Sequence, residues 1–362
     1  MKIVADESMP LVKELFSPYG DITMLPGRQI SSENIKYADV LLTRSVTSVN
    51  EELLKNSEIK FVGSATIGTD HIDQVYLRER DICFSNAPGC NSNAVIQYVL
   101  SSMFSLRPNW MEQTVGIVGC GSIGGKLYKI LNDLGVDCCC YDPFLDASKD
   151  NHLVTFEEII KSDILTLHVP LTVDGPFPTY HLFSDEVFSN LKTDTLLINT
   201  SRGAVIDNRT LLNFIKTRSC QISLDVWENE PNILLPLLKV VDICTPHIAG
   251  YSHDGKVKGT QMIFEAFCSR YNISEPVIPP KEKLFKLSSD SIHEAIIATF
   301  DIKKIDHLMK KTLLKKTGNT SVKFDALRKN CPKRYDFNRY YLKKNTDITL
   351  ALNLQKIGFT KL

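Results

Sequence analysis

Polar side chains that could bind and oxidise a hydroxy acid follow three apolar runs of the sequence. Arg202 stands in INTSRGAVID, Asp225, Glu228 and Glu230 stand in LDVWENEP, and His247 stands in CTPHIAGY. An arginine fork can hold a carboxylate and a neighbouring carbonyl oxygen. A histidine can accept the proton of a hydroxyl group, and a paired carboxylate selects its tautomer and favours its charged form. An arginine, a carboxylate and a histidine together are what hydride transfer from a 2-hydroxy acid requires.

A glycine-rich stretch, GIVGCGSIGG, has the G-x-G-x-x-G spacing of a dinucleotide-binding turn. A strand-like run precedes it, a helical pattern follows it, and Asp142 closes the next strand-like run. An acid there, followed by Pro143 and without an adjacent arginine, accepts bonds from ribose hydroxyls and favours NAD over NADP. The candidate cofactor-binding residues of this motif are Gly119, Gly121, Ser122, Ile123, Gly124 and Asp142.

Two series of short apolar runs should form the sheets that position these residues. In both series helical segments alternate with the runs, which predicts parallel sheets. The first series covers residues 2–6, 21–25, 39–45, 59–65 and 82–88, and the second covers residues 114–119, 136–142, 164–170, 195–201, 222–227 and 242–248. We therefore predict an α/β protein with two Rossmann-like, doubly wound parallel-sheet domains and a small C-terminal α+β domain. Helices are expected at 91–106 and 255–271.

Composition excludes some classes of function. The net charge is zero, although residues 281–362 hold 19 Lys and Arg against eight Asp and Glu. We interpret this basic segment as a solvated face and expect no nucleic-acid partner. No apolar run approaches a membrane span and the first residues do not resemble a signal peptide, so we expect a cytoplasmic protein. The ten cysteines lack a C-x-x-C pair, and Cys138, Cys139 and Cys140 are interpreted as small buried side chains, with no metal expected.

The motifs GIVGCGSIG, HVPLT, INTSRGAVID, LDVWENEP and PHIAG, across residues 60–255, resemble the D-isomer-specific 2-hydroxyacid dehydrogenase family. The resemblance implies a substrate domain of residues 1–91 and 255–280 and an NAD-binding domain of residues 92–254. It implies that Arg202 binds the 2-oxo acid, that His247 is the acid–base group and that Glu230 supports it. The cofactor contacts that it adds are Val169, Thr200, Ser201, Arg202, Asp225 and Gly250.

Further strings, among them VADESMP, TRSVTSVN, FSNAPGCN and PHIAGYS, resemble the family members that oxidise 4-phospho-D-erythronate in vitamin B6 biosynthesis. This implies Ser45, Thr66 and Tyr251 as substrate contacts. It also implies that residues 281–362 are a dimerisation domain of a homodimer. Two alternatives stay open: another phosphorylated D-2-hydroxyacid dehydrogenase, of the 3-phosphoglycerate type, and a non-catalytic NAD-sensing module.

Overall fold

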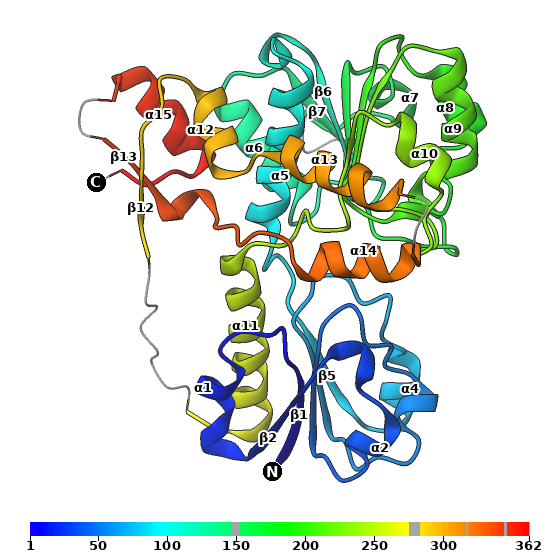
Figure 1. Cartoon of the computed structure of the whole chain (residues 1–362), viewed down its shortest axis with the longest axis vertical. Coiled ribbons are helices and arrows are strands. Elements are labelled where there is room, and N and C mark those ends of the chain that lie inside the picture. The colour runs from blue at the N-terminus through cyan, green and yellow to red at the C-terminus, as the bar shows by residue number, and fades with distance from the viewer. Residues whose placement is uncertain (147–151, 275–282, 316–317, 344–345, 362) are drawn as a thin grey trace. The chain divides into compact units, whose positions relative to one another are not determined.

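The chain divides into two compact units (Figure 1). The computed structural model describes residues 1–146, 152–274, 283–315, 318–343 and 346–361. Unit 1 consists of Met1–Asn91 and Tyr251–Glu282, and unit 2 of Ser92–Gly250 and Lys283–Leu362. Each unit contains a parallel sheet with flanking helices, which confirms the predicted fold class.

Unit 1 has a five-stranded parallel sheet in the order β2-β1-β3-β4-β5, a doubly wound arrangement. Its strands are β1 (Lys2–Asp6), β2 (Asp21–Leu25), β3 (Val40–Thr43), β4 (Phe61–Ser64) and β5 (Cys83–Asn86). Its α-helices are α1 (Val12–Phe16), α2 (Ser32–Ile35), α3 (Glu51–Leu54), α4 (Gln74–Glu79) and α11 (His253–Tyr271). The central strands are buried because helices cover both faces of the sheet.

The long helix α11 belongs to unit 1 although the second unit's sheet precedes it in the chain. Ser252 caps it, its hydroxyl accepting a bond from the Gly255 backbone N–H at 2.9 Å. The helix therefore begins two residues before the predicted position. It packs beside α1, where the ring of Phe16 lies edge-on to Phe264 and Phe267, with centroids 5.1 and 5.2 Å away. These aromatic contacts build one core of the unit.

Unit 2 contains a six-stranded parallel sheet in the order β11-β10-β9-β8-β6-β7. A single parallel bridge between Cys140 and Leu153 adds one more pairing outside β7. With it, the strand order is that of a Rossmann sheet. The strands are β6 (Val115–Val118), β7 (Cys138–Tyr141), β8 (Ile164–Leu167), β9 (Leu196–Asn199), β10 (Gln221–Leu224) and β11 (Ile243–Cys244). The helices up to residue 250 are α5 (Ser92–Leu106), α6 (Gly124–Asp133), α7 (Phe156–Ile159), α8 (Asp185–Asn190), α9 (Asn208–Thr217) and α10 (Leu235–Val240).

Strand β11 is much shorter than the apolar run at 242–248 predicts. Pro246 has no backbone N–H to donate to a ladder, and His247 has a φ of 56°. The chain therefore leaves the sheet after Cys244 and turns at His247. This early exit separates the side chain of His247 from the strand and makes it part of a loop.

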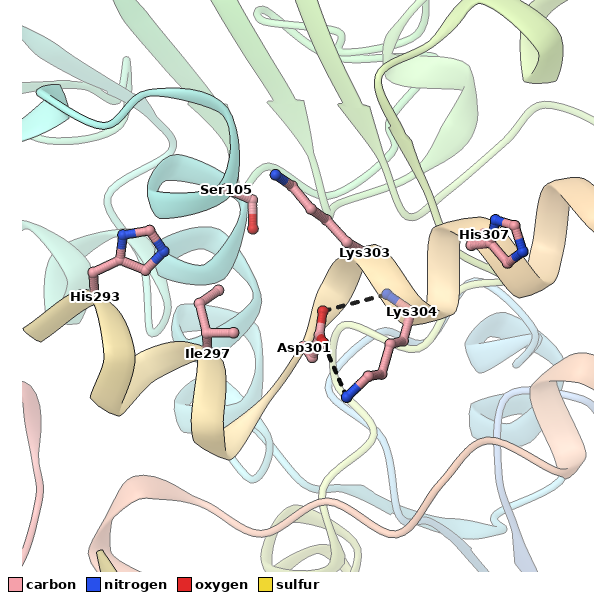
Figure 2. A pocket seen from close by; sticks show the side chains of 7 residues that line it. All are labelled: Ser105, His293, Ile297, Asp301, Lys303, Lys304 and His307. Carbon is pink, nitrogen blue, oxygen red and sulfur yellow. Dashed lines mark hydrogen bonds and ion pairs between the residues drawn. The ribbon is translucent and has the colours of Figure 1, made fainter. Parts of the chain in front are cut away.

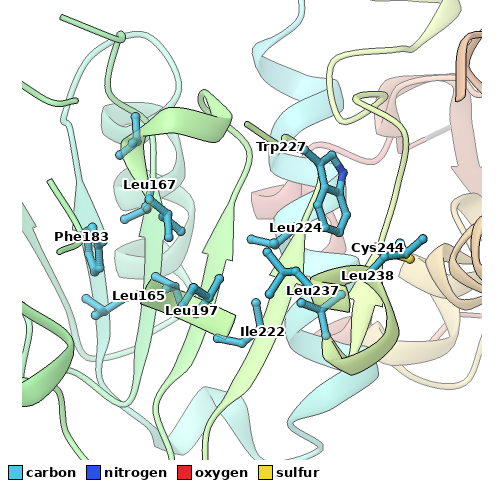
Figure 3. Packing of buried hydrophobic residues seen from close by; sticks show 14 of the residues in the cluster. Leu165, Leu167, Phe183, Leu197, Ile222, Leu224, Trp227, Leu237, Leu238 and Cys244 are labelled. Atoms are coloured by element: carbon cyan, nitrogen blue, oxygen red, sulfur yellow. The ribbon is translucent and has the colours of Figure 1, made fainter. Parts of the chain in front are cut away.

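The C-terminal residues pack on the second unit's sheet rather than forming a third unit. Met309, Leu313 and Phe324 are fully buried in the same core as the β8, β9 and β10 side chains that Figure 3 shows. The elements are α12 (Ile292–Thr299), α13 (Ile302–Leu313), α14 (Thr320–Lys329), α15 (Ile348–Ile357) and the parallel pair β12 (Phe285–Leu287) and β13 (Tyr340–Leu342). The predicted boundary at 280–281 lies outside the described residues, and the dimerisation role stays a prediction.

Candidate active site

The glycine loop joins β6 to α6. Gly119 has a φ of +93°, and a Cβ atom there would lie 2.7 Å from the carbonyl oxygen of His168. A Cβ atom at Gly124, the first residue of α6, would overlap the carbonyl oxygen of Gly119. A Cβ atom at Gly121 would meet nothing within 4 Å. The first and third glycines thus permit the close turn, and the second leaves the space that a pyrophosphate needs beside a helix N-terminus.

Asp142 follows β7 and lies against this loop. Its Oδ2 accepts a bond from the backbone N–H of Cys120 at 3.0 Å, and its Oδ1 accepts one from that of Phe144 at 3.1 Å. The carboxylate is thus held beside the glycine turn, where an acid that binds ribose hydroxyls is expected.

The turn after β9 is organised by the side chain of Asn199. Its Oδ1 accepts bonds from the Ser201 backbone N–H at 3.0 Å and hydroxyl at 2.8 Å, and its Nδ2 donates to the Arg202 carbonyl at 2.9 Å. The guanidinium of Arg202 donates to the Ser201 carbonyl at 2.7 Å. Asn199 therefore fixes the predicted segment Thr200–Arg202 at the carboxyl end of the sheet.

A further predicted cofactor contact, Val169, follows β8. Its Cγ1 would lie 3.0 Å from a Cβ atom at Gly119. Next to Val169, His168 approaches Thr166 at 3.0 Å and Thr200 at 3.5 Å, and burial lowers its pKa to about 3. His168 is therefore a neutral structural imidazole at neutral pH.

Asp225 follows β10 and is buried. Its Oδ1 accepts bonds from the Thr245 hydroxyl at 2.6 Å and the Ile248 N–H at 2.7 Å, and its Oδ2 accepts one from the Ala249 N–H at 2.8 Å. Both oxygens thus hold the loop around His247, whose own N–H donates to the Asp225 carbonyl at 2.8 Å. The structure places Asp225 as the anchor of the loop that ends at the predicted contact Gly250.

His247 and Glu230 form a direct pair. The imidazole Nδ1 lies 2.8 Å from Glu230 Oε2, and the Trp227 N–H donates to Glu230 Oε1 at 2.8 Å. Burial opposes the charge of Glu230, but the His247 charge and hydrogen bond, with Arg328 and the Trp227 N–H, outweigh it and lower the pKa of Glu230. An ionised Glu230 accepts a hydrogen bond from Nδ1–H, so Nε2 of the neutral imidazole is the nitrogen that can take a substrate proton.

Two arginines of the C-terminal segment support this loop, and sequence reasoning did not assign them a role. Arg328, on α14, contributes to the lowered pKa of Glu230. Arg334 is buried, donates to the carbonyl of Ile248 at 3.1 Å and to that of Ala249, and stacks on the ring of Phe300 with 4.2 Å to its centroid. Both arginines lie more than 70 residues from His247 along the chain, so no local sequence pattern indicates that they support its loop.

The predicted substrate contacts of unit 1 lie around the ends of β3 and β4. The Thr66 hydroxyl donates to the Gly68 carbonyl at 2.9 Å and accepts a bond from the Ser64 hydroxyl at 2.8 Å. Ser45 follows Arg44 in the turn after β3. The ring of Tyr251 has Arg44 and Lys256 on it, with 4.9 and 4.6 Å to its centroid. Two basic side chains thus lie against one ring, and the carboxylate of Asp6 adds a negative charge near Arg44.

A cavity of about 500 Å³ lies elsewhere in unit 2, beside α5, α12 and α13 (Figure 2). Figure 2 shows Asp301 paired with Lys304 at its edge, 3.2 Å apart. It is lined by Ser105, His293, Ile297, Asp301, Lys303, Lys304 and His307. None of these residues belongs to the predicted site.

Comparison with known proteins decides the family. Over 99% of both chains, the sequence is 43% identical to an erythronate-4-phosphate dehydrogenase from Saccharophagus degradans. It is 38% identical to one from Klebsiella pneumoniae, over 99% of this chain and 98% of that protein. This chain belongs to the erythronate-4-phosphate dehydrogenase family. Residues 100–249 match the model of the D-isomer specific 2-hydroxyacid dehydrogenase NAD binding domain. The predicted family and the predicted cofactor, NAD, are thereby confirmed.

Solved structures confirm the fold. An NAD⁺-bound 3-phosphoglycerate dehydrogenase from Entamoeba histolytica superimposes with a TM-score of 0.66 at 24% identity, covering 75% of this chain and 95% of that one. A D-lactate dehydrogenase from Aquifex aeolicus gives a TM-score of 0.62 at 22% identity, covering 75% of this chain and 94% of that one. The roles of the individual site residues stay predictions.

Proposed function

We propose that this chain oxidises 4-phospho-D-erythronate to (R)-3-hydroxy-2-oxo-4-phosphobutanoate, a step of vitamin B6 biosynthesis, with NAD as the hydride acceptor. Full-length similarity to erythronate-4-phosphate dehydrogenases supports the substrate. The single structural observation that supports the chemistry is the 2.8 Å contact between His247 Nδ1 and Glu230 Oε2, at the carboxyl ends of the strands of an NAD-binding sheet.

The loop around Gly121 fits the dinucleotide. The space at Gly121 and the N-terminus of α6 would receive the pyrophosphate, and Asp142 would receive the ribose hydroxyls. When bound there, NAD supplies the acceptor for the hydride that leaves C2 of the substrate.

The protein's own groups move the proton and hold the acid. We assign to His247 Nε2 the removal of the C2 hydroxyl proton as the hydride leaves, which turns the alcohol into a carbonyl group. The resulting imidazolium is stabilised by the Glu230 carboxylate, and Asp225 keeps the loop in place. Arg202 is assigned to the substrate carboxylate and the developing carbonyl oxygen, which its planar fork can bind together.

The phosphate end of the substrate is assigned to the basic group of unit 1. Arg44 and Lys256 lie against the ring of Tyr251 and offer two positive charges. Ser45 and Thr66 each follow the end of β3 or β4 by two residues and offer hydroxyl groups. A phosphate dianion would be attracted by both cations.

A homodimer in the cytoplasm completes the proposal. On α15, Ile348 and Leu352 are 77% and 52% exposed and lie four residues apart, on one helix face. Such a face supports an apolar contact with a second copy.

All ten cysteines are free thiols, which is typical of a reducing compartment. No helix in the described part of the chain is long and apolar enough to cross a membrane.

NADH absorbance tests the activity directly. We expect NADH to form from NAD with 4-phospho-D-erythronate, and much more slowly with unphosphorylated D-erythronate or D-3-phosphoglycerate. Equal rates with 3-phosphoglycerate would favour the neighbouring dehydrogenase type. NAD binding without turnover of any of these acids would favour a sensing module and contradict the proposal.

The phosphate assignment has its own test. Arg44→Met should raise the KM for the phosphorylated acid and narrow its advantage over D-erythronate, while Arg78→Met, at an exposed position on α4 of the same unit, should change neither. A preference for the phosphorylated acid that survives in Arg44→Met would contradict the role of Arg44.

A further inference from the structure

Two thiols and an imidazole converge beside the glycine loop of unit 2. The sulfur atoms of Cys120 and Cys140 and a ring nitrogen of His152 all lie within 4.8 Å of one another. The Cys120 Sγ is 3.8 Å from His152 Nε2. None of these three side chains takes part in the proposed dehydrogenase chemistry.

Main-chain contacts hold each of the three residues in place. Cys120 stands between Gly119 and Gly121, with its N–H bonded to Asp142. Cys140 is buried on β7; its N–H donates to the His152 carbonyl at 2.8 Å, and its carbonyl accepts from the Val154 N–H at 2.9 Å. These two bonds tie residue 152 to the sheet edge.

Ring stacking orients the imidazole. The ring of His152 lies on that of Tyr128 from α6, with centroids 4.1 Å apart and planes inclined by 19°. The contact leaves the edge that carries Nε2 directed at Cys120. The cluster is therefore supported from the loop, the strand and the helix.

The spacing matches a tetrahedral metal site. With Zn–S bonds of about 2.3 Å and Zn–N bonds of about 2.0–2.1 Å, tetrahedral angles place sulfur and nitrogen about 3.6 Å apart and two sulfurs about 3.8 Å apart. The observed Cys120–His152 separation of 3.8 Å differs little from the first value. A disulfide would instead need the two sulfurs about 2.05 Å apart and would give the imidazole no role.

Cysteine binds a metal ion as the thiolate. A cation at this cluster would therefore be bound by two thiolates and a neutral imidazole, and its binding would release the thiol protons.

We propose that Cys120, Cys140 and His152 form a three-ligand site for a thiophilic cation of the Zn²⁺ class, with the fourth coordination position open to water. Two thiolates and one imidazole are ligands that favour Zn²⁺ over Mg²⁺ or Ca²⁺. Binding releases the thiol protons and involves no change of oxidation state. The site is independent of the dehydrogenase assignment, since it uses none of the residues to which proton transfer or substrate binding is assigned.

Cadmium titration of the reduced full-length protein tests the site. Cd²⁺ is a probe for such ligands because its thiolate complexes absorb in the ultraviolet. The spectrum of the metal-free protein is subtracted to isolate this absorption. We expect one tight Cd²⁺ equivalent per chain, displaced by Zn²⁺. Cys120→Ser and His152→Gln should each weaken Cd²⁺ binding about 100-fold or more, since removing a group that merely hydrogen-bonds to a metal ligand already costs about 10–100-fold in affinity.

Cys139→Ser is the matched control. Cys139 is adjacent to Cys140 on β7 but faces the other side of the sheet, where Ser162 bonds it. Its substitution should leave the tight equivalent unchanged. A titration in which Cys120→Ser or His152→Gln binds Cd²⁺ as tightly as the unaltered chain, or in which no tight equivalent exists, would overturn the proposal. Cys120 and His152 are only partly buried, so far-ultraviolet circular dichroism should show both variants folded, whereas Cys140→Ser perturbs the core.

Discussion

Replacing Glu230 with Gln separates the charge of this side chain from its shape. In the structure Glu230 accepts two bonds, from His247 Nδ1 and from the Trp227 N–H, both at 2.8 Å. A glutamine has only one acceptor oxygen, so one of these donors must face an NH₂ group. The variant therefore removes the negative charge next to His247 and one hydrogen bond of about 1 kcal/mol.

The size of the electrostatic effect follows from the distance. Unit charges centred about 4 Å apart interact by about 4 kcal/mol at an effective dielectric constant of about 20, equivalent to about three pH units. The His247 and Glu230 side chains are 27% and 19% exposed, so solvent screening reduces this value. We expect the acidic limb of the kcat/KM profile for oxidation to move to lower pH by about one to three units, because the imidazolium loses its partner.

The sign for stability follows from the lowered pKa of Glu230. Its carboxylate stabilises the fold above the ordinary value of 4.5, and this contribution is lost as the pH falls through the lowered value. Glu230→Gln should therefore flatten the acid side of the unfolding free-energy profile.

The assay is initial-rate NADH formation from pH 5 to pH 9 with saturating NAD. Glu228→Gln is the matched control, because Glu228 lies in the same loop but bonds His181 at 2.7 Å and the Asn208 N–H at 2.8 Å. In the Glu228→Gln control the acidic limb of the kcat/KM profile should lie at the same pH as in the unaltered protein. If the limb of Glu230→Gln stays in place as well, the pair does not set the acid–base step and the assignment of Glu230 is wrong.

Four further outcomes are expected. His247→Ala should bind NADH normally by fluorescence while turnover falls about 10²–10⁴-fold; near-normal turnover would exclude it as the base. Asp142→Ala should narrow the preference for NAD over NADP in kcat/KM, and an unchanged ratio would mean that the ribose is recognised elsewhere. Arg334→Met should lower both kcat and the thermal unfolding midpoint, because two loop carbonyls lose their donor; no change in either would remove its positioning role. Leu352→Glu should sediment as a monomer if α15 is the dimer contact, and a persistent dimer would place the interface elsewhere.

Much of the fold could be predicted from the sequence, because apolar runs and turn residues act locally. The glycine spacing placed the turn between β6 and α6, and every predicted apolar run contains an observed strand. The polar residues after β9 and β10 could be expected at one sheet edge because parallel strands end together. Chemistry predicts a carboxylate partner for His247, the family resemblance selects Glu230 for it, and the structure shows the contact.

What was missed depends on contacts between residues distant in sequence. Pattern alone did not show that Asp225 would use both carboxylate oxygens on its own loop, or that Arg334 would bond the carbonyls after His247. The Cys120–Cys140–His152 cluster was missed for the same reason. The three cysteines of β7 were considered as a run, whereas alternation along a strand puts Cys140 with residues 120 and 152 and Cys139 on the other face.

The discontinuity of unit 1 has a consequence for the newly synthesised chain. Residues 1–91 leave the ribosome first, but Ile263, Phe264 and Phe267 of α11, which cover one face of their sheet, follow only after the whole of 92–250. At a translation rate of about 5–20 residues per second, that delay is roughly ten to thirty seconds. During this interval the apolar side chains on the sheet face where α11 packs against β4 and β5 are exposed to water. The first domain to be translated therefore cannot complete its core until most of the second unit has been made, and its exposed sheet face needs protection from aggregation in the meantime.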